Sequence, residues 1–271
     1  MKKYVLVTGT SGGIGRAVAL RLLNAGFDVF GCNRRESAID HPNFHAVKMD
    51  VTSEESVLAA REAVMQRTEA LEAVINISGM MFMGSLIEEP AGRLEQIMNV
   101  NLLGMDRVNR VFFPMIENGH GRIINFSSEY GTYAVVPFNA FYTTSKHAVE
   151  SYSDGLRREL KYLGIPVITI RPGAFKTEME QSTGEIFRRI TENSTHYKGV
   201  LSKMMPLLVG GTKNAKDPDV MARVVMKAVT DKHPKNIYSC NHNLGVKLMS
   251  LLPGRVVDEI FYRMFKTEKI H

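Results

Sequence analysis

Residues 3–15 read KYVLVTGTSGGIG, a short apolar run that ends in a glycine-rich turn and continues into a helical pattern. Ile14, Val18 and Leu22 then repeat every four residues, and Gly26 ends the repeat. Glycine lacks a Cβ atom, so the backbone of this turn can approach a ligand closely. The helix that follows would direct free N–H groups and a positive dipole end at the turn, which suits a pyrophosphate. The glycines do not have the G-x-G-x-x-G spacing, and an ordinary tight turn is the alternative interpretation.

Strand-like and helix-like segments alternate along the rest of the chain. The strand-like runs are DVFGC (28–32), AVINISG (73–79), GRIINFSS (121–128) and PVITIRP (166–172). A helical pattern begins near residue 53, further helical patterns follow the run 73–79 through about residue 116, and another covers 142–163. This alternation predicts an α/β fold, a doubly wound Rossmann-type parallel sheet with helices on both faces.

Two helix signals are specific enough to be tested. Thr52 and Glu55 have the spacing of a capping box at the start of a helix. In the segment 142–163, an apolar stripe ends before Gly164; its members are Val149, Tyr152, Leu156, Leu160 and Leu163. We therefore expect the last of these leucines to share the buried face of the helix.

The composition indicates one globular domain over residues 1–271. Hydrophobic residues make up 44% and charged residues 23% of the chain, and no low-complexity linker divides it. No segment approaches the roughly eighteen consecutive apolar residues of a membrane-spanning helix. The opening MKKYVLVTG has too short an apolar run for a signal peptide, and we expect a cytoplasmic protein.

The charge and cysteine content argue against two other classes of protein. The 34 basic and 28 acidic residues give a net charge of +6, but the basic residues are scattered. This pattern favours a solvated surface over a nucleic-acid-binding face. Cys32 and Cys240 form neither a disulfide framework nor a metal-binding spacing, so we expect no metal site.

The segment YTTSK, residues 142–146, places a tyrosine four positions before a lysine at the start of a helix. This spacing brings the two side chains onto one helix face. Such a pair is ordinarily a half-buried tyrosine beside a solvated lysine. Alternatively, because a free phenol has a pKa of about 10 and a nearby cation stabilises the phenolate, Tyr142 and Lys146 would form an acid/base pair.

Together with the glycine turn, these residues resemble the short-chain dehydrogenase/reductase family of NAD(P)-dependent oxidoreductases. The resemblance is close over residues 3–177 and looser beyond them. The family's phosphate loop, T-G-x-x-x-G-I-G, is matched from Thr8 to Gly15. The other landmarks follow in the family's order: Asp50–Val51, NISG (76–79), NVNLLG (99–104), INFSS (124–128), YTTSK (142–146) and RPGAFKT (171–177).

The resemblance implies an oxidoreductase that transfers a hydride between NADP(H) and a carbonyl compound or its alcohol. Tyr142 would be the general acid/base, and Lys146 would bind the nicotinamide ribose. Ser128 would donate to the substrate oxygen, and Asn101 would hold a water that links Lys146 to solvent. The separation of Ser128 from Tyr142 is one residue longer than is usual in the family, so Ser127 is the alternative serine. The implied cofactor-binding residues are Gly9, Ser11, Gly13, Ile14, Gly15, Asn33, Arg34, Arg35, Asp50, Val51, Asn76, Ser78, Gly79, Tyr142, Lys146, Pro172, Gly173, Phe175 and Thr177.

The segment CNRR, residues 32–35, bears on which cofactor is bound. NAD-preferring sites usually place an acidic residue about twenty positions beyond the glycine turn, where this chain has Asn33. Arg34 and Arg35 could meet the 2′-phosphate of NADP, although surface arginines are often merely solvated. We therefore expect NADP(H), with NAD(H) possible, and reduction as the working direction.

The remaining segments concern the substrate. In the family, residues 178–212 would form a lid over the substrate pocket. Met80, Met81, Phe82 and Met83 indicate an adaptable apolar wall, or equally ordinary core packing. An apolar carbonyl substrate, such as a steroid, a retinoid or a fatty-acyl derivative, is the resulting expectation.

The C-terminal segment 244–267 has a strong apolar helical face after Pro253. We expect residues 253–267 to bury that face on the substrate pocket or at a subunit interface, in a homodimer or homotetramer. Two alternatives stay open: a peripheral membrane enzyme that acts through this helix, and a non-catalytic protein that senses NADP(H). The face consists of Val256, Val257, Ile260, Phe261, Met264 and Phe265.

Overall fold

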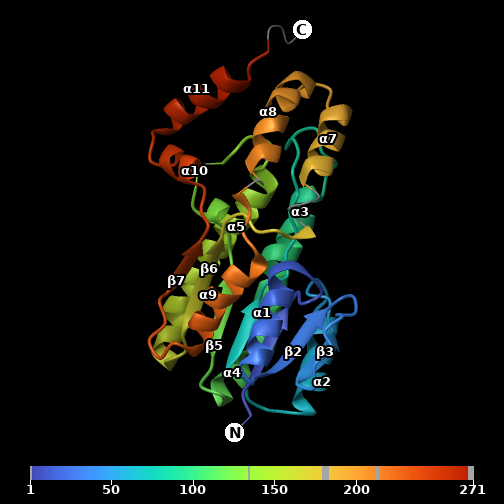
Figure 1. The fold of residues 1–271 in the computed structure, drawn as a ribbon, viewed down its shortest axis with the longest axis vertical. Helices are drawn as coiled ribbons and strands as arrows, with labels where there is room; N and C mark the ends of the chain where they lie inside the picture. The colour runs from blue at the N-terminus through green and yellow to red at the C-terminus, as the bar shows by residue number, and fades with distance from the viewer. Residues whose placement is uncertain (1, 134, 179–182, 212–213, 268–271) are drawn as a thin grey trace.

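The computed structural model describes residues 2–133, 135–178, 183–211 and 214–267, so the expected lid at 178–212 lies partly outside the described residues. Within them, one parallel sheet carries helices on both faces (Figure 1), as the sequence predicted. The strand order is β3-β2-β1-β4-β5-β6-β7. The strands are β1 Tyr4–Thr8, β2 Asp28–Asn33, β3 Phe44–Lys48, β4 Ala73–Asn76, β5 Arg122–Phe126, β6 Val167–Pro172 and β7 Ile237–Cys240. The sequence did not predict the residues of β3 or β7, the two edge strands; β7 pairs only with β6.

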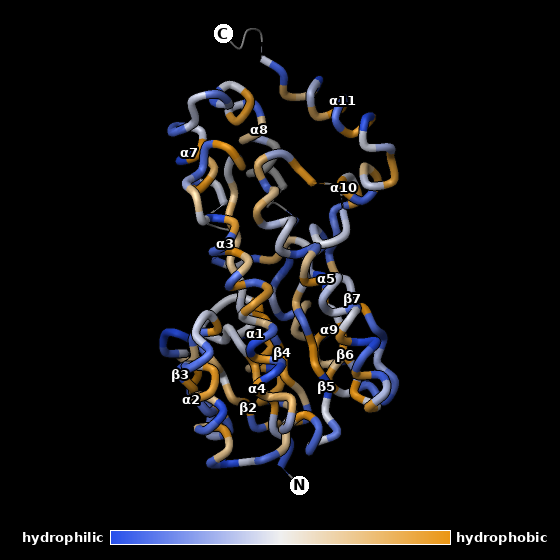
Figure 2. Tube along the Cα trace, turned by 180° about the vertical axis from the view of Figure 1, so that it is seen from behind, coloured by the Kyte–Doolittle hydropathy of each residue, from blue (hydrophilic) through white to orange (hydrophobic). Residues whose placement is uncertain are grey.

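Two hydrophobic cores lie on the two faces of the sheet. Helices α1 Gly13–Asn24 and α9 Pro218–Thr230 pack on one face, and α2 Glu54–Met65, α4 Gly104–Asn118 and α5 Ala140–Leu160 pack on the other. Strand alternation explains the division, because Val5 and Val7 belong to the first core and Leu6 to the second. Figure 2 shows the matching run of hydrophobic residues along the central strands.

Two helix ends differ from the sequence-based expectations. The N-cap of α2 is Ser53, whose hydroxyl accepts from the Ser56 N–H, whereas the Thr52 hydroxyl donates to Asp50. The capping box predicted from Thr52 and Glu55 is therefore wrong by one position. Helix α5 ends at Leu160 and continues only as a 3-10 turn, so Leu163 is 56% exposed instead of buried.

A further group of helices lies beyond the ends of the strands (Figure 1). Here a third hydrophobic cluster joins Phe187, Met204 and Phe265 to Met83 and Val136 of two loops. Its helices thus pack over the loops that follow the strands. The helices of this region are α3 Arg93–Met98, α7 Thr183–Asn193, α8 Lys198–Gly211, α10 Leu244–Met249 and α11 Gly254–Phe265.

The C-terminal helix α11 buries only part of its apolar face. Val257 and Phe265 are buried, whereas Val256 is 43% and Met264 is 50% exposed. Hydrophobic and hydrophilic residues alternate along this helix in Figure 2. Within the single chain this face is thus only partly buried, and its burial at a subunit interface stays a prediction. Among the described residues, no helix combines the length and the apolar character needed to cross a membrane.

The sheet topology selects one edge for a ligand. Sequence order reverses between β1 and β4, which are neighbours in the sheet. In doubly wound folds, a crevice forms outside the carboxyl ends of the strands at such a reversal. The glycine turn follows β1, and Asn76 ends β4. These two predicted cofactor-binding segments therefore lie at the sheet edge where such a crevice is expected.

Candidate active site

The glycine turn after β1 has a backbone geometry that disfavours side chains at its glycine positions. Gly9 and Gly13 have positive φ angles of 80° and 53°, which other residues rarely adopt. A Cβ atom on Gly15 would lie 2.0 Å from the Gly9 carbonyl oxygen. Gly12, the N-cap of α1, provides no side chain to cap the first-turn N–H groups. The turn therefore offers uncapped donors at a helix N-terminus, beside which lie Ser11 and Ile14.

Asn33 fastens this turn to the end of β2. Its Oδ1 accepts from the Ser11 N–H at 3.1 Å, and its Nδ2 donates to the Thr10 hydroxyl at 2.7 Å. Asn33 is also buried, so its side chain supports the turn and does not face solvent. Arg34 and Arg35, in contrast, are exposed. The two arginines are thus the accessible cations at the position where the sequence suggested selection of a 2′-phosphate.

The Asp50–Val51 pair follows β3 and lies near Arg34. Thr52 donates twice to Asp50, through its N–H at 2.9 Å and its hydroxyl at 2.7 Å. Desolvation raises the pKa of Asp50, but these hydrogen bonds and the nearby Arg34 outweigh it and lower the pKa overall. The adjacent Val51 is buried against Gly104, where a Cβ atom would lie 2.7 Å from its side chain. The pair is therefore fixed beside the arginine-bearing turn.

Thr8 joins the ends of β1 and β4. Its hydroxyl oxygen accepts from the N–H groups of Ile77 and Ser78, each at 3.0 Å. A Cβ atom on Gly9 would lie 3.2 Å from the Ser78 nitrogen. Asn76 is buried and donates to Asn109 and Asn125 instead of facing the crevice. Ser78 thus lies against the glycine turn, and a Cβ atom on Gly79 would lie 3.8 Å from the Lys146 Nζ atom, while Asn76 anchors the strand behind them.

Tyr142 and Lys146 lie together in the first turns of α5, as their spacing predicted. The Lys146 Nζ atom is 5.8 Å from the centre of the Tyr142 ring and donates to the Phe126 carbonyl at 2.9 Å. Burial lowers the pKa of Lys146 to about 8, against an opposing effect of Glu150. The Tyr142 ring is half-buried and meets the Tyr130 ring edge-on, with centroids 6.5 Å apart. The pair is a buried ammonium beside a phenol.

Asn101 lies in a π-helical turn, Asn99–Leu103, between α3 and α4. Such turns are rare and widen the helix, often at functional sites. The Asn101 side chain is fully buried, accepts from the Met80 N–H at 2.8 Å, and donates to the Met80 carbonyl and the Ser145 hydroxyl, each at 2.9 Å. Asn101 therefore ties the loop after β4 to α5 beside Lys146.

The two serines after β5 face different groups. The Ser127 hydroxyl is directed at the backbone of α5, 3.5 Å from the Lys146 carbonyl oxygen. The Ser128 hydroxyl accepts from the Tyr130 N–H at 3.2 Å and caps the 3-10 turn Glu129–Gly131. Both side chains are buried. The contact of Ser127 with the α5 backbone favours Ser128 as the serine available to a ligand.

The segment after β6 returns to the glycine turn. A Cβ atom on Gly13 would lie 3.1 Å from the Thr177 methyl group. Phe175 is buried, and the Gly173 N–H donates to the Cys240 carbonyl at 2.9 Å. Pro172 is the last residue of β6. The four residues implied to hold the nicotinamide therefore run from the sheet to the glycine turn.

A family model ties this arrangement to known proteins. Residues 3–186 match the model described as short chain dehydrogenase. The chain belongs to this family. Among the described residues of this short-chain dehydrogenase, no cluster of ligating side chains could hold a metal ion.

Its similar proteins span nearly the whole chain. The uncharacterized oxidoreductase YbbO of Escherichia coli K12 is 31% identical over 267 residues, which cover 96% of this chain and 94% of that protein. Human retinol dehydrogenase 16 is 30% identical and covers 96% of this chain and 88% of its own length. A short-chain dehydrogenase structure from Streptomyces avermitilis has a TM-score of 0.78, 22% identity, and coverage of 97% and 96%. The actinorhodin polyketide ketoreductase with NADPH has a TM-score of 0.74, 27% identity, and coverage of 90% and 97%.

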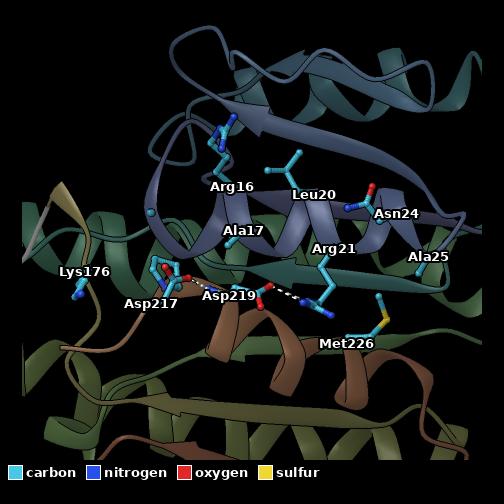
Figure 3. Close-up of a pocket in the computed structure, with 12 residues that line it drawn as sticks. Arg16, Ala17, Leu20, Arg21, Asn24, Ala25, Lys176, Asp217, Asp219 and Met226 are labelled. Carbon is cyan, nitrogen blue, oxygen red and sulfur yellow. Dashed lines mark hydrogen bonds and ion pairs between the residues drawn. The ribbon is translucent and has the colours of Figure 1, made fainter. Parts of the chain in front are cut away.

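A surface cavity of about 590 Å³ lies between α1 and α9 of this dehydrogenase (Figure 3). Gly13 and Lys176 line it near the glycine turn, and an ion pair spans it, with Arg21 Nη2 2.6 Å from Asp219 Oδ1. None of the four catalytic candidates lines this cavity. We therefore do not assign the substrate to it.

Several side chains that shape the site were not identified from the sequence. Thr8 and Thr10 act through hydroxyl contacts with loops far along the chain, and Tyr130 touches Tyr142 through a ring contact. Thr8 could have been identified from the sequence, because it is the threonine that begins the T-G-x-x-x-G-I-G motif. Tyr130 had no such signal, because its contact depends on how the loop after β5 folds.

The buried Lys146 gives a prediction about stability. Replacing Lys146 with methionine removes an ammonium whose pKa falls from 10.5 in water to about 8 in the fold. Burial disfavours the charged form, so the ammonium lowers the free energy of unfolding. This destabilisation is fully present below pH 8 and fades as the pH rises towards 10.5. Allowing for the lost hydrogen bond to Phe126, we expect Lys146→Met to raise the free energy of unfolding by about 1 to 2 kcal/mol at neutral pH.

Urea denaturation of the cofactor-free protein at pH 7 and pH 10.5 measures this effect. The gain should shrink at the higher pH. Lys161→Met, at an exposed position after α5, is the matched control and should change little. A Lys146→Met variant that is less stable than the wild type at pH 7 would show that burial does not destabilise the ammonium.

Proposed function

We propose that this short-chain dehydrogenase is an NADP(H)-dependent reductase of apolar carbonyl compounds, with Tyr142 as the general acid. The observation that carries the proposal is the Tyr142–Lys146 pair, whose Nζ-to-ring distance is 5.8 Å, next to a glycine turn with uncapped N–H groups. These residues fit a dinucleotide: the turn admits the close approach of a pyrophosphate, and Arg34 and Arg35 offer exposed cations. Proteins similar to this chain are named as an oxidoreductase and as retinol dehydrogenases. They do not favour the non-catalytic sensor.

The proposed mechanism assigns one task to each side chain. When bound, the nicotinamide supplies a hydride to the substrate carbon. Tyr142 gives its proton to the substrate oxygen, and the Lys146 ammonium stabilises the phenolate that remains. Ser128 donates to the same oxygen while negative charge develops on it. The side-chain amide of Asn101 already donates to the Met80 carbonyl and to the Ser145 hydroxyl. Asn101 would therefore accept a hydrogen bond from the relay water through one of its oxygen atoms.

The surroundings of Tyr142 support an apolar substrate. Tyr142 packs, with Met80 and Met98, against an apolar cluster of Phe82, Ile97 and Phe141. Tyr130 packs against the cluster that includes residues of α7, α8 and α11. Two cavities of about 330 and 520 Å³ share Pro137, Phe138 and Tyr197 beside that cluster. We propose that the described parts of 178–212 cover the substrate as a lid. Homodimer or homotetramer assembly stays a prediction, which light scattering of the purified chain measures.

A substrate panel tests the proposed function. Aldehydes, ketones, ketosteroids and ketoacyl thioesters are each incubated with the protein and NADPH, and oxidation of NADPH is followed. We expect turnover of at least one apolar carbonyl compound, with polar analogues of similar size reacting more slowly. If no compound is reduced although NADPH binds, the site is a cofactor-binding site without the proposed chemistry.

A further inference from the structure

The residues that connect β7 to α10 contact two loops of the active site at once. His242 lies between them: its Nε2 is 2.9 Å from the Arg171 carbonyl oxygen, and its Nδ1 is 2.5 Å from the Tyr133 hydroxyl. A carbonyl oxygen can only accept, so Nε2 carries the ring hydrogen. In the neutral ring Nδ1 then accepts from Tyr133. His242 therefore bridges the loop after Ser128 to the backbone just before Pro172.

Asn241 strengthens the second of these contacts. Its φ angle of 60° is left-handed, a conformation that asparagine tolerates better than most residues. Its Nδ2 donates to the Ala174 carbonyl at 2.7 Å and to the Asn214 carbonyl at 3.1 Å. A Cβ atom on Gly173 would lie only 1.9 Å from the Asn241 carbonyl oxygen. The segment implied to hold the nicotinamide is thus packed directly on Asn241.

Glu129 closes the arrangement from the other side. This carboxylate follows Ser128 directly, is only 4% exposed, and accepts from the Asn243 N–H at 2.5 Å. Three consecutive residues, 241–243, therefore hold the loop that carries Ser128 and the segment that begins at Pro172. The Arg171 side chain continues the chain of contacts to α5 through two hydrogen bonds to Glu150, at 2.9 and 2.8 Å.

We propose that Asn241 and His242 are positioning residues that set the separation between Ser128 and the nicotinamide-binding segment 172–177. The proposal rests on the proposed function, because hydride transfer is the step that needs this separation. Ser128 would hold the carbonyl oxygen, and residues 172–177 would hold the ring that delivers the hydride. A misplacement of about 1 Å between reacting groups can cost roughly a hundredfold in rate. Loss of the bridge should therefore slow hydride transfer more than it weakens binding.

Four variants test the bridge. His242→Ala removes both ring contacts, and His242→Gln keeps one N–H donor and one oxygen acceptor at the end of the side chain. Tyr133→Phe removes only the hydroxyl and cannot leave a large cavity, so it should fold even where His242→Ala does not. Asn241→Gly keeps the left-handed backbone and removes the two side-chain hydrogen bonds. His233→Ala, at an exposed histidine between α9 and β7, is the matched control.

The first readout needs neither cofactor nor substrate. Hydrogen exchange of the cofactor-free protein reports the backbone N–H groups of the Ser128 loop and of residues 173–176. We expect His242→Ala and Asn241→Gly to speed exchange in residues 173–176, and Tyr133→Phe to speed it in residues 129–133. Exchange in β1 should stay as in the wild type. Unchanged exchange in both segments would overturn the bridge.

The second readout separates positioning from a general structural role. With a substrate from the panel, His242→Ala should lower kcat about tenfold to a hundredfold, change the KM for NADPH less than about threefold, and raise the primary deuterium isotope effect on kcat. His242→Gln should recover most of the loss. An unchanged isotope effect, or a loss that matches only the fraction of unfolded protein, would overturn the positioning role. If the wild type reduces no carbonyl compound, the proposed function is rejected instead. The hydrogen-exchange measurement alone would then test whether residues 241–243 bridge the two loops.

Discussion

Replacing Tyr142 with phenylalanine is expected to lower kcat by at least about two orders of magnitude and to leave the affinity for NADPH nearly unchanged. The phenylalanine ring keeps the contacts with Tyr130 and with the apolar cluster of Phe82, Ile97 and Phe141. Only the hydroxyl that protonates the substrate oxygen is lost. Lys146 retains its hydrogen bond to the Phe126 carbonyl and its proposed contact with the ribose. Rate and binding should therefore separate in this variant.

The measurement is kcat on the best substrate of the panel, together with a titration of NADPH fluorescence. Tyr162→Phe, at a tyrosine that is 92% exposed, is the control for loss of a phenol hydroxyl and should behave as the wild type. Turnover in Tyr142→Phe within a few fold of the wild type would remove Tyr142 as the general acid. A parallel loss of NADPH affinity would instead assign Tyr142 mainly to binding.

Changing Arg34 to aspartate together with Arg35 to alanine is expected to weaken NADPH binding by about ten- to a hundredfold and to weaken NADH binding much less. Both arginines are exposed at the end of β2, and Asn33 cannot replace them because its amide holds Ser11 and Thr10. A guanidinium can give a phosphate two charge-assisted hydrogen bonds, and each such contact is worth about 1.5 to 3 kcal/mol. An aspartate at the same place repels the phosphate and can accept from ribose hydroxyls.

The two dissociation constants are measured by fluorescence titration of wild type and variant at the same ionic strength, because salt screens such contacts. Arg157→Asp with Arg158→Ala changes the charge equally on the last turn of α5 and serves as the control. If the double variant keeps the preference of the wild type, or if the wild type binds NADH more tightly than NADPH, selection by Arg34 and Arg35 is wrong.

The parts of the fold that depend on local pattern were predictable from the sequence. The apolar runs of β1, β4 and β5 and the four-residue repeat of α1 each reflect burial along one element, so they predicted the sheet and its flanking helices. The Tyr142–Lys146 contact was predictable for the same reason, since one helix sets its geometry. The prediction that Thr52 caps α2 was wrong because the adjacent Ser53, which is an equally good N-cap residue, accepts the hydrogen bond from the first turn of the helix.

The parts that depend on contacts between distant segments were not predictable. Gly173 meets Asn241 only because β7 pairs with β6, and the short run IYSC gave no strand signal of its own. Asn33, the last residue of β2, was expected among the cofactor-binding residues, but the sequence did not predict that its amide holds the glycine turn. The spacing of α11 predicted an amphipathic helix but not how much of its apolar face is buried within one chain, where Val256 and Met264 stay about half exposed.

The most direct test of the proposed reaction is the transfer of deuterium. NADPH labelled with deuterium at the reactive carbon of the nicotinamide is incubated with the protein and the carbonyl compound that it consumes fastest. The alcohol product is then examined by mass spectrometry and NMR. The proposed function predicts one deuterium on the former carbonyl carbon in the wild-type product, and a far slower appearance of the same product with Tyr142→Phe. An alcohol that carries only solvent hydrogen at that carbon, or NADPH consumed without any alcohol formed, would contradict it.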